Sequence, residues 1–248
     1  MLGAGLFSAG LPVASLLGGF MGSNLTGKGI VMVQLASSVV AAAIIIGKNK
    51  ELKGIAANSK RFLREFLLGR DVLDYYLLRK KGVLTSLELI YDRTCERMVK
   101  LLDPDVRRSV IGRQSGAENA ALSVREIELV RGTCEHTVQE EEIRIEHGMG
   151  MLATIVTASP MLGLLGTVWG VLDAFAMMGD KGTVLLSEIA PAISSALVTT
   201  VVGLLVAIPS AICYNNLAAK VRQLTTDMDG FADELLGRIA CEFQGRDA

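Results

Sequence analysis

This sequence of 248 residues has almost no net charge, only two histidines and no closely spaced pair of cysteines. Its 25 basic and 26 acidic residues give a formal net charge of −1. The chain therefore lacks the basic excess of nucleic-acid-binding proteins, and no nucleic-acid partner is predicted. The two histidines, His136 and His147, stand in no HExxH motif, and no CxxC pair occurs. We predict no metal site, no cofactor, and reduced structural cysteines at Cys95, Cys134, Cys213 and Cys241.

Motifs of enzymatic chemistry are missing as well. The sequence has no phosphate-binding loop, no metal cluster and no nucleophile paired with a base, so an enzyme is not predicted. It also lacks the alternation of apolar and polar residues that is typical of half-buried β-strands. The expected fold class is all-α.

Charge is absent from three long apolar runs. Half of the residues are hydrophobic and 21% are charged, with a mean hydropathy of +0.42, so the two kinds must be segregated along the chain. Residues 29–47, 148–172 and 189–219 carry no Asp, Glu, Lys, Arg or His. At about 1.5 Å per helical residue, the runs are roughly 28, 37 and 46 Å long, so each can cross the hydrocarbon core of about 30 Å and the third is longer than the membrane needs. One such run would fit a buried core helix, but three predict transmembrane helices.

Lysine and arginine predict the orientation of these helices. Basic residues cluster after the first run, and Lys220 and Arg222 follow the third, whereas the connection between the second and third runs carries only Lys181. The positive-inside rule therefore predicts that the N-terminus faces outward and that the C-terminus is cytoplasmic. The predicted organisation is an external or interfacial arm (1–28), transmembrane helix 1 (29–47), a cytoplasmic helical domain (48–147), transmembrane helix 2 (148–176), a periplasmic loop (177–187), transmembrane helix 3 (188–214) and a cytoplasmic C-terminal helix (215–248).

Helical spacing continues in the charged parts of the chain. Apolar residues recur from Leu84 to Leu102, and Asp103-Pro104 should end that helix. A second helix, 120–147, is expected to run directly into the second span. The N-terminus has no basic residue before its apolar run, which disfavours a cleaved signal peptide. Near the C-terminus, a stripe with a spacing near 3.5 is predicted to pack on another helix or on a neighbouring subunit: Val221, Leu224, Met228, Phe231, Leu235 and Ile239.

Small residues are concentrated in the second and third spans. Gly163, Gly166 and Gly170 fall along one side of the second span, and small residues that include Gly203 repeat every four positions in the third. In lipid no hydrophobic force draws helices together, so association depends on close backbone contact. We therefore predict that these four glycines pack helices of one chain, or of neighbouring copies, against each other.

Hydroxyl side chains accompany the glycines. For Thr167, Ser195, Thr199 and Thr200, two interpretations stay open: the hydroxyl bonds a carbonyl of its own helix or joins two helices, or it lines a narrow pore and orders water or passes a proton. Asp173 ends the second span and either attracts cations to a pore mouth or marks the membrane interface. Because the three runs contain no ionisable group, a proton path would need an acid from a second protein.

Four segments resemble the ExbB/TolQ proton-channel proteins, which are relatives of the flagellar stator subunit MotA: LLGTVWGVLDAF, IAPAISSALVTTVVGLLVAIPSAICYN, AAAIIIGK and NSKRFLREF. Three spans resemble the ExbB/TolQ type more than MotA, which has four. The resemblance implies an inner-membrane homopentamer around two copies of an ExbD- or TolR-like single-span partner, whose membrane aspartate carries H⁺; Na⁺ is not excluded. It also implies work at the cell envelope, in TonB-type import or Tol-type maintenance, through a TonB- or TolA-like protein.

By position, the resemblance implies that Thr167 and Thr200 match the pore threonines of the family. Ser195 stands where many relatives carry glutamate, which shifts the need for an acid to the partner. Two alternatives remain: a non-conducting membrane scaffold with the same helix packing, and a MotA-like stator subunit.

Overall fold

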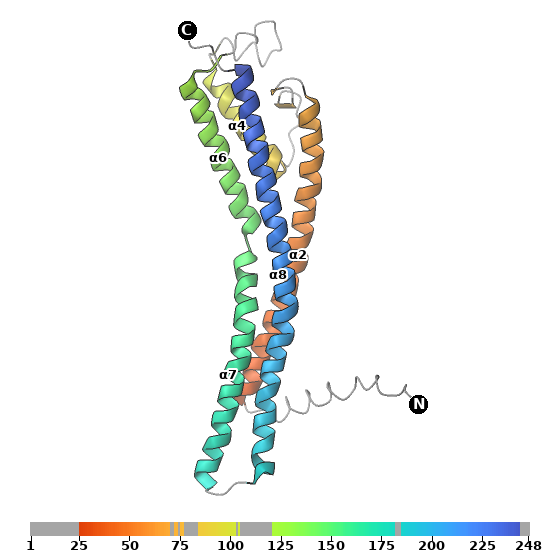
Figure 1. Cartoon of the computed structure of the whole chain (residues 1–248), viewed down its shortest axis with the longest axis vertical. Coiled ribbons are helices and arrows are strands. Elements are labelled where there is room, and N and C mark those ends of the chain that lie inside the picture. Colours follow the sequence, from red (N-terminus) through yellow and green to blue (C-terminus); the bar gives the residue numbers. More distant parts are fainter. Residues whose placement is uncertain are drawn as a thin grey trace, which may run out of the picture. The chain divides into compact units, whose positions relative to one another are not determined.

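The computed structural model of the chain describes residues 25–69, 72–73, 75–76, 84–102, 104, 121–181 and 185–243. This described part contains no β-strand, and three of its helical stretches are long and apolar enough to cross a membrane. The prediction of an all-α fold with three membrane-spanning helices is therefore confirmed. The helices are α2 (Leu25–Leu68), α4 (Ser86–Leu101), α6 (Val124–Glu146), α7 (Met149–Lys181) and α8 (Leu186–Phe243) (Figure 1).

The chain divides into two compact units. We call the first, 1–47 with 148–217, the apolar unit, and the second, 48–147 with 218–248, the charged unit. The long helices α2 and α8 each contribute one segment to both units. This division follows the composition of the chain, because the three uncharged runs end close to these boundaries.

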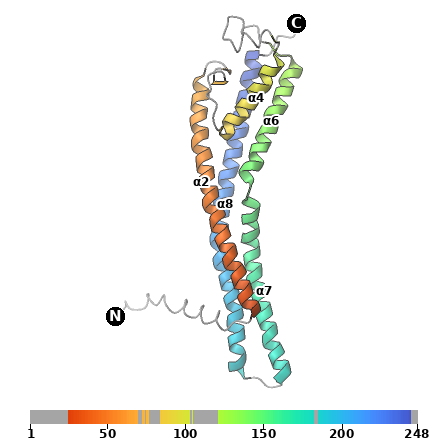
Figure 2. The same cartoon turned by 180° about the vertical axis from the view of Figure 1, so that it is seen from behind.

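In the apolar unit, the membrane-spanning parts of α2, α7 and α8 lie side by side, as both views show (Figures 1 and 2). The buried side chains of this unit include small or polar ones, such as Gln34, Ser159 and Thr199, together with larger apolar ones such as Leu152. Large apolar side chains such as Val39 and Met161, which are about 70% exposed, point outward. An outer surface of this composition is suited to contact with lipid, where every backbone polar group is bonded inside a helix.

In the charged unit, a conventional hydrophobic core forms among α2, α4, α6 and α8. The stripe predicted near the C-terminus is buried here, so it packs on other helices of the same chain. Phe62, Phe66, Tyr75, Tyr91 and Phe231 form a cluster of rings with centroids 5.1–6.2 Å apart, mostly edge to face. Aromatic pairs at such distances stabilise a core beyond the area that they bury.

Two hydrogen bonds join the end of α8 to distant segments of the charged unit. The N–H of Leu122, just before α6, donates to the carbonyl of Phe243 at the end of α8 (2.7 Å). The N–H of Val72 donates to the carboxylate of Glu242 (3.1 Å).

All four cysteines are free, and burial raises the pKa of the Cys95 and Cys134 thiols, which keeps them protonated and unreactive.

Part of the connection predicted between the second and third spans is helical. The predicted loop covers 177–187, whereas α7 continues to Lys181 and α8 begins at Leu186. Gly179 lies within α7 and does not end this helix, because a glycine inside an α-helix weakens it without breaking it. At the other end, α2 already begins at Leu25, and residues 1–24 of the predicted arm lie outside the described residues.

The expectation that the helix over 120–147 runs directly into the second span is wrong. Ser123 caps the N-terminus of α6, which ends at Glu146, and α7 starts at Met149. Between the two helices, His147 leaves helical geometry (φ −52°, ψ 131°) and Gly148 has a φ of +87°. Only glycine adopts this left-handed conformation without a steric penalty, so Gly148 separates the two helices.

A capping box begins α6 and provides the first testable prediction. The Ser123 hydroxyl accepts from the N–H of Glu126 (3.3 Å), and the Glu126 carboxylate accepts from the N–H of Ser123 (2.8 Å). Ser123→Ala should destabilise this helix end by about 1 kcal/mol, which corresponds to roughly fivefold faster amide exchange in the first turn of α6. Hydrogen–deuterium exchange with mass spectrometry measures this, and Thr133→Ala, which removes a hydroxyl bonded within the same helix, is the control.

The effect of this capping box should depend on pH. The backbone N–H of Ser123, and then its hydroxyl, lower the pKa of the Glu126 carboxyl below its ordinary value. A lowered pKa in the folded state means that this stabilisation is present above the ordinary pKa and is lost as the pH falls through the folded value. The difference between wild type and Ser123→Ala should shrink in acid, and a constant difference would contradict this assignment.

Candidate functional site

Three glycines of α7 lie directly against α8. A Cβ atom on Gly163 would lie 2.8 Å from the Cα atom of Thr200, and one on Gly166 would lie 2.1 Å from the Oγ1 atom of Thr199. On Gly170 it would lie 2.5 Å from a side chain of α8. Real Cβ atoms do not approach other atoms within 3.0 Å, so only glycine permits these backbones to lie so close. The structure places the three glycines at a contact between two helices of the same chain.

Gly203 of α8 faces both of the other helices of the apolar unit. A Cβ atom at this position would lie 2.6 Å from the backbone oxygen of Ser159 in α7 and 2.8 Å from the Nε2 atom of Gln34 in α2. The missing side chain at Gly203 therefore makes room for three helices to meet at one level.

Two threonines of α8 donate hydrogen bonds to the same backbone oxygen of α7. The Oγ1 atoms of Thr199 and Thr200 lie 3.1 Å and 2.8 Å from the carbonyl oxygen of Gly163. Thr199 is 1% exposed and also bonds the carbonyl of Ala196 in its own helix (2.7 Å). For these two residues, the interpretation as bonds that join helices describes the contact within one chain, and a pore-lining role stays a prediction.

The other two candidate hydroxyls bond locally. The Ser195 hydroxyl donates to the carbonyl of Ala192 (2.9 Å), and the Thr167 hydroxyl donates to that of Leu164 (2.7 Å). Ser195 is buried, whereas Thr167 and Thr200 are each partly exposed. Of the four predicted pore residues, Thr167 and Thr200 thus keep some surface that can face another chain or water.

Asp173 lies in a narrow crevice between α7 and α8. The crevice has a volume of only about 10 Å³, close to the lower limit for one bound water molecule. It brings Asp173 together with four other predicted site residues, Gly166, Gly170, Ser195 and Thr199. The rest of its lining, Gly27, Trp169 and Ala196, was not predicted. Thr167 and Thr200 do not line it.

Comparison with known proteins identifies the family. A model of the MotA/TolQ/ExbB proton channel family matches residues 109–230. The chain is 29% identical over 219 residues to the Tol-Pal system protein TolQ of Haemophilus influenzae, which covers 87% of this chain and 89% of that protein. It is 41% identical over 96 residues to the biopolymer transport protein ExbB of Neisseria gonorrhoeae, covering 39% of this chain and 44% of that protein. The chain belongs to the MotA/TolQ/ExbB proton channel family.

The resemblance stated from the sequence motifs is therefore confirmed. The ExbB of Aquifex aeolicus is 44% identical over 84 residues, or 34% of this chain and 57% of that protein, so both ExbB alignments span less than two thirds of those relatives. The chain is a proton-channel subunit of the ExbB/TolQ type and a multi-pass protein of the inner membrane. The family consists of channel and transport-associated proteins rather than enzymes.

Gln34 of α2 belongs to the candidate site, although it was not predicted from the sequence. Its side chain is completely buried, and its Nε2 atom donates to the carbonyl of Ser159 in α7 (3.3 Å). An amide carries no charge, so Gln34 is not one of the ionisable residues of the sequence. The signal was a single amide within the otherwise apolar or small residues of the first run, since buried polar groups in a membrane usually face other helices.

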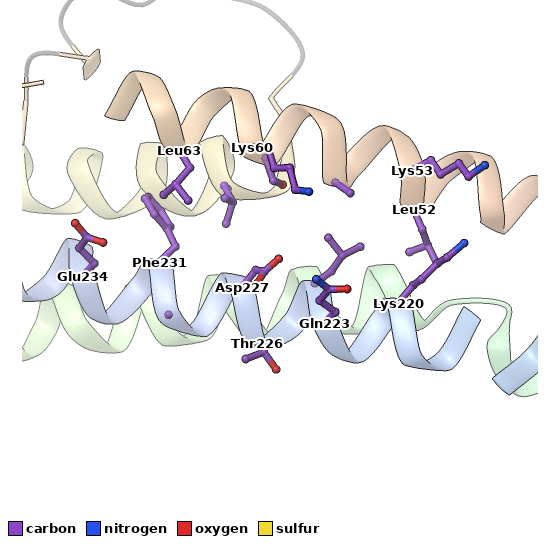
Figure 3. A pocket seen from close by; sticks show the side chains of 15 residues that line it. Leu52, Lys53, Lys60, Leu63, Lys220, Gln223, Thr226, Asp227, Phe231 and Glu234 are labelled. Carbon is purple, nitrogen blue, oxygen red and sulfur yellow. The ribbon is translucent and has the colours of Figure 1, made fainter. Parts of the chain in front are cut away.

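The charged unit contains a cavity of about 660 Å³ between its segments of α2 and α8, much larger than the crevice at Asp173 (Figure 3). Apolar side chains such as Leu52 and Phe231 line part of its wall, and Lys60 and Asp227 point into it from opposite helices (Figure 3). At one end, the Lys220 ammonium donates to the Asn49 side chain (2.8 Å). The sequence analysis did not predict this cavity, which forms between segments that are distant in the sequence.

The contact at Gly166 provides a second testable prediction. In Gly166→Ala, the new Cβ would meet Thr199 at 2.1–3.0 Å, so α7 and α8 must separate. Overpacking of this kind costs about 1–3 kcal/mol, which outweighs the gain of up to ~1 kcal/mol in helix propensity. Thermal unfolding in detergent, followed by the fluorescence of the only tryptophan, Trp169, should show a lowered midpoint.

Gly150→Ala is the matched control, because a Cβ on this glycine of the same helix meets nothing within 4 Å. This variant should unfold at or slightly above the wild-type midpoint. Equal midpoints for the two alanine variants would contradict the close approach of α7 to α8.

Proposed function

We propose that this chain is the multi-span subunit of an ion-driven complex, a homopentamer around an ExbD- or TolR-like single-span partner whose membrane aspartate carries the protons. One observation carries this proposal. The chain belongs to a proton channel family, yet its three uncharged runs contain no acid or base at membrane depth. A proton relay across a bilayer needs a titratable group, so that group must belong to another polypeptide.

The proposed orientation places the N-terminus in the periplasm and the C-terminus in the cytoplasm. It is supported by the basic residues that follow the first and third spans, against the single Lys181 in the connection between the second and third. The charged unit would then face the cytoplasm. The basic residues concerned are Lys48, Lys50, Lys53, Lys60, Arg61, Arg64, Lys220 and Arg222.

The proposed ion path runs past the partly exposed hydroxyls of Thr167 and Thr200, with H⁺ as the ion and Na⁺ not excluded. Ser195 and Thr199 are buried in the contact between α7 and α8, and we propose that they support the wall of the path. Asp173 would stand near the periplasmic mouth. Each proton that crosses the field supplies about 2.3 kcal/mol per 100 mV, which is enough to bias a contact between packed helices.

The proposed output is work at the cell envelope. The relatives are named as a Tol-Pal system protein and as biopolymer transport proteins, so Tol-type maintenance and TonB-type import are both supported, through a TolA- or TonB-like protein. The alternative is a non-conducting scaffold, and one observation favours it: each of the four candidate hydroxyls already donates to a backbone carbonyl. A MotA-like stator role fits less well with three spans.

Proton flux into liposomes distinguishes channel from scaffold. The complex of this chain with its single-span partner should conduct, and Thr167→Val or Thr200→Val should lower the flux at least tenfold, equivalent to about 1.4 kcal/mol. Thr200→Ser keeps the hydroxyl and should conduct. Thr154→Val, which removes a hydroxyl bonded to its own helix, is the control.

Two results would contradict the proposal. The first is full flux from this chain reconstituted without any partner, because the carrier would then lie in this chain. The second is wild-type flux from both valine variants, which would exclude these hydroxyls from the ion path.

A further inference from the structure

Gln34 lies at the point where all three helices of the apolar unit meet. Its side chain is 0% exposed, and its Nε2 atom lies 3.3 Å from the carbonyl oxygen of Ser159. The orientation of the amide is fixed by chemistry, because a carbonyl only accepts hydrogen bonds and the opposite orientation would bring two oxygens together. The Ser159 hydroxyl is bonded to its own helix, at the carbonyl of Ile155 (2.7 Å), so the backbone oxygen is the group that receives Gln34.

The same amide touches the contact between α7 and α8. Its Nε2 atom would lie 2.8 Å from a Cβ on Gly203 and 3.4 Å from a Cβ on Gly163. Gly163 is also the residue whose carbonyl receives the hydroxyls of Thr199 and Thr200. The two glycines that leave room for Gln34 are therefore on different helices, and one of them is the hydrogen-bond acceptor that joins those helices.

The second polar atom of this side chain argues against a simple stabilising role. The Oε1 atom is buried and has no hydrogen-bond partner within the described residues. A buried acceptor without a donor is unfavourable, and a hydrogen bond between helices in a membrane contributes little to stability on average. An apolar side chain of the same length would pack at this site without that penalty. Buried polar groups that stability does not favour are known to fix helix register in coiled coils.

We propose that Gln34 is a positioning residue that fixes the register of α2 against the α7–α8 pair through its amide donor. The bond joins residues 125 positions apart and ties the first span to the pair that carries all four predicted pore hydroxyls. The register itself is independent of conduction. Only its consequence, that α2 holds these hydroxyls in place for ion flow, rests on the proposed function.

Glutamine, methionine and glutamate have side chains of similar length, so a comparison of wild type with Gln34→Met and Gln34→Glu tests the hydrogen-bond donor at this position. Gln34→Met keeps the shape and removes both polar atoms. Gln34→Glu keeps the shape but donates to Ser159 only while its carboxyl is protonated. Burial in an apolar site favours that neutral form, and the three runs around it carry no other acid or base. Ser37→Ala removes a hydroxyl that donates to the backbone carbonyl of Gln34 (2.8 Å) but leaves the side-chain amide of Gln34 intact, so it is the control for the amide.

The register can be measured without any ion flux. Spin labels at Val39 of α2 and Leu164 of α7, both exposed, report one distance in the full complex, with Cys213 and Cys241 replaced by serine and labelled chains diluted with unlabelled ones. We expect one narrow distance distribution for wild type and Ser37→Ala at every pH. We expect a broadened or second distribution for Gln34→Met, with a thermal midpoint equal to or above that of wild type.

The pH series of Gln34→Glu is the decisive measurement. The narrow distribution should be present in acid, where the carboxyl donates, and should be lost as the pH rises. Proton flux relative to wild type at the same pH should follow, at least tenfold lower in Gln34→Met and recovered by Gln34→Glu in acid. A wild-type distribution in Gln34→Met, or no recovery of Gln34→Glu in acid, would overturn the proposal. A complex that conducts no protons would overturn the proposed function and leave the distances as the test of register.

Discussion

The close approach of α7 to α8 is the constraint on which the apolar unit depends. Lipid offers no hydrophobic force between helices, so two helices adhere only where their backbones come close enough for packing and for hydrogen bonds between them. At Gly163 a side chain would lie 2.8 Å from the backbone of α8, and the carbonyl of the same glycine accepts hydrogen bonds from two threonine hydroxyls. The glycine therefore supplies both the space and the acceptor.

The charged unit is stabilised by different physics. There the hydrophobic effect operates, and the unit contains what such a core requires: leucine and isoleucine stripes, an aromatic cluster and a capped helix start. Helices α2 and α8 pass through both units. Each of them therefore needs small residues for close backbone contact in one segment and large apolar residues for a hydrophobic core in the other. In α8 this is visible as small residues such as Ala196, Thr199 and Gly203 in the first half, and a stripe of large residues from Val221 to Ile239 in the second.

Much of the fold was predictable because it depends on local spacing. Uncharged runs indicated the spans, and the 3–4 residue spacing of Gly163, Gly166 and Gly170 indicated a packing face. The break between α6 and α7 was missed although its signal was present, since a glycine directly after a helix commonly adopts a left-handed conformation. The stripe near the C-terminus left two partners open, because spacing identifies the buried face of a helix but not the surface that covers it.

By itself, the sequence determined which segments are helical, which of them suit a membrane, and that none of the three uncharged runs contains an acid or a base. These properties follow from the local composition and from the spacing of apolar residues, both of which can be read within a short stretch of sequence. Only the tertiary structure decided that Thr199 and Thr200 share the carbonyl of Gly163, that Asp173 and Ser195 line one crevice, and that Gln34 reaches Ser159. Those contacts depend on the rotation of each helix about its axis, which is set by packing between residues far apart in the chain.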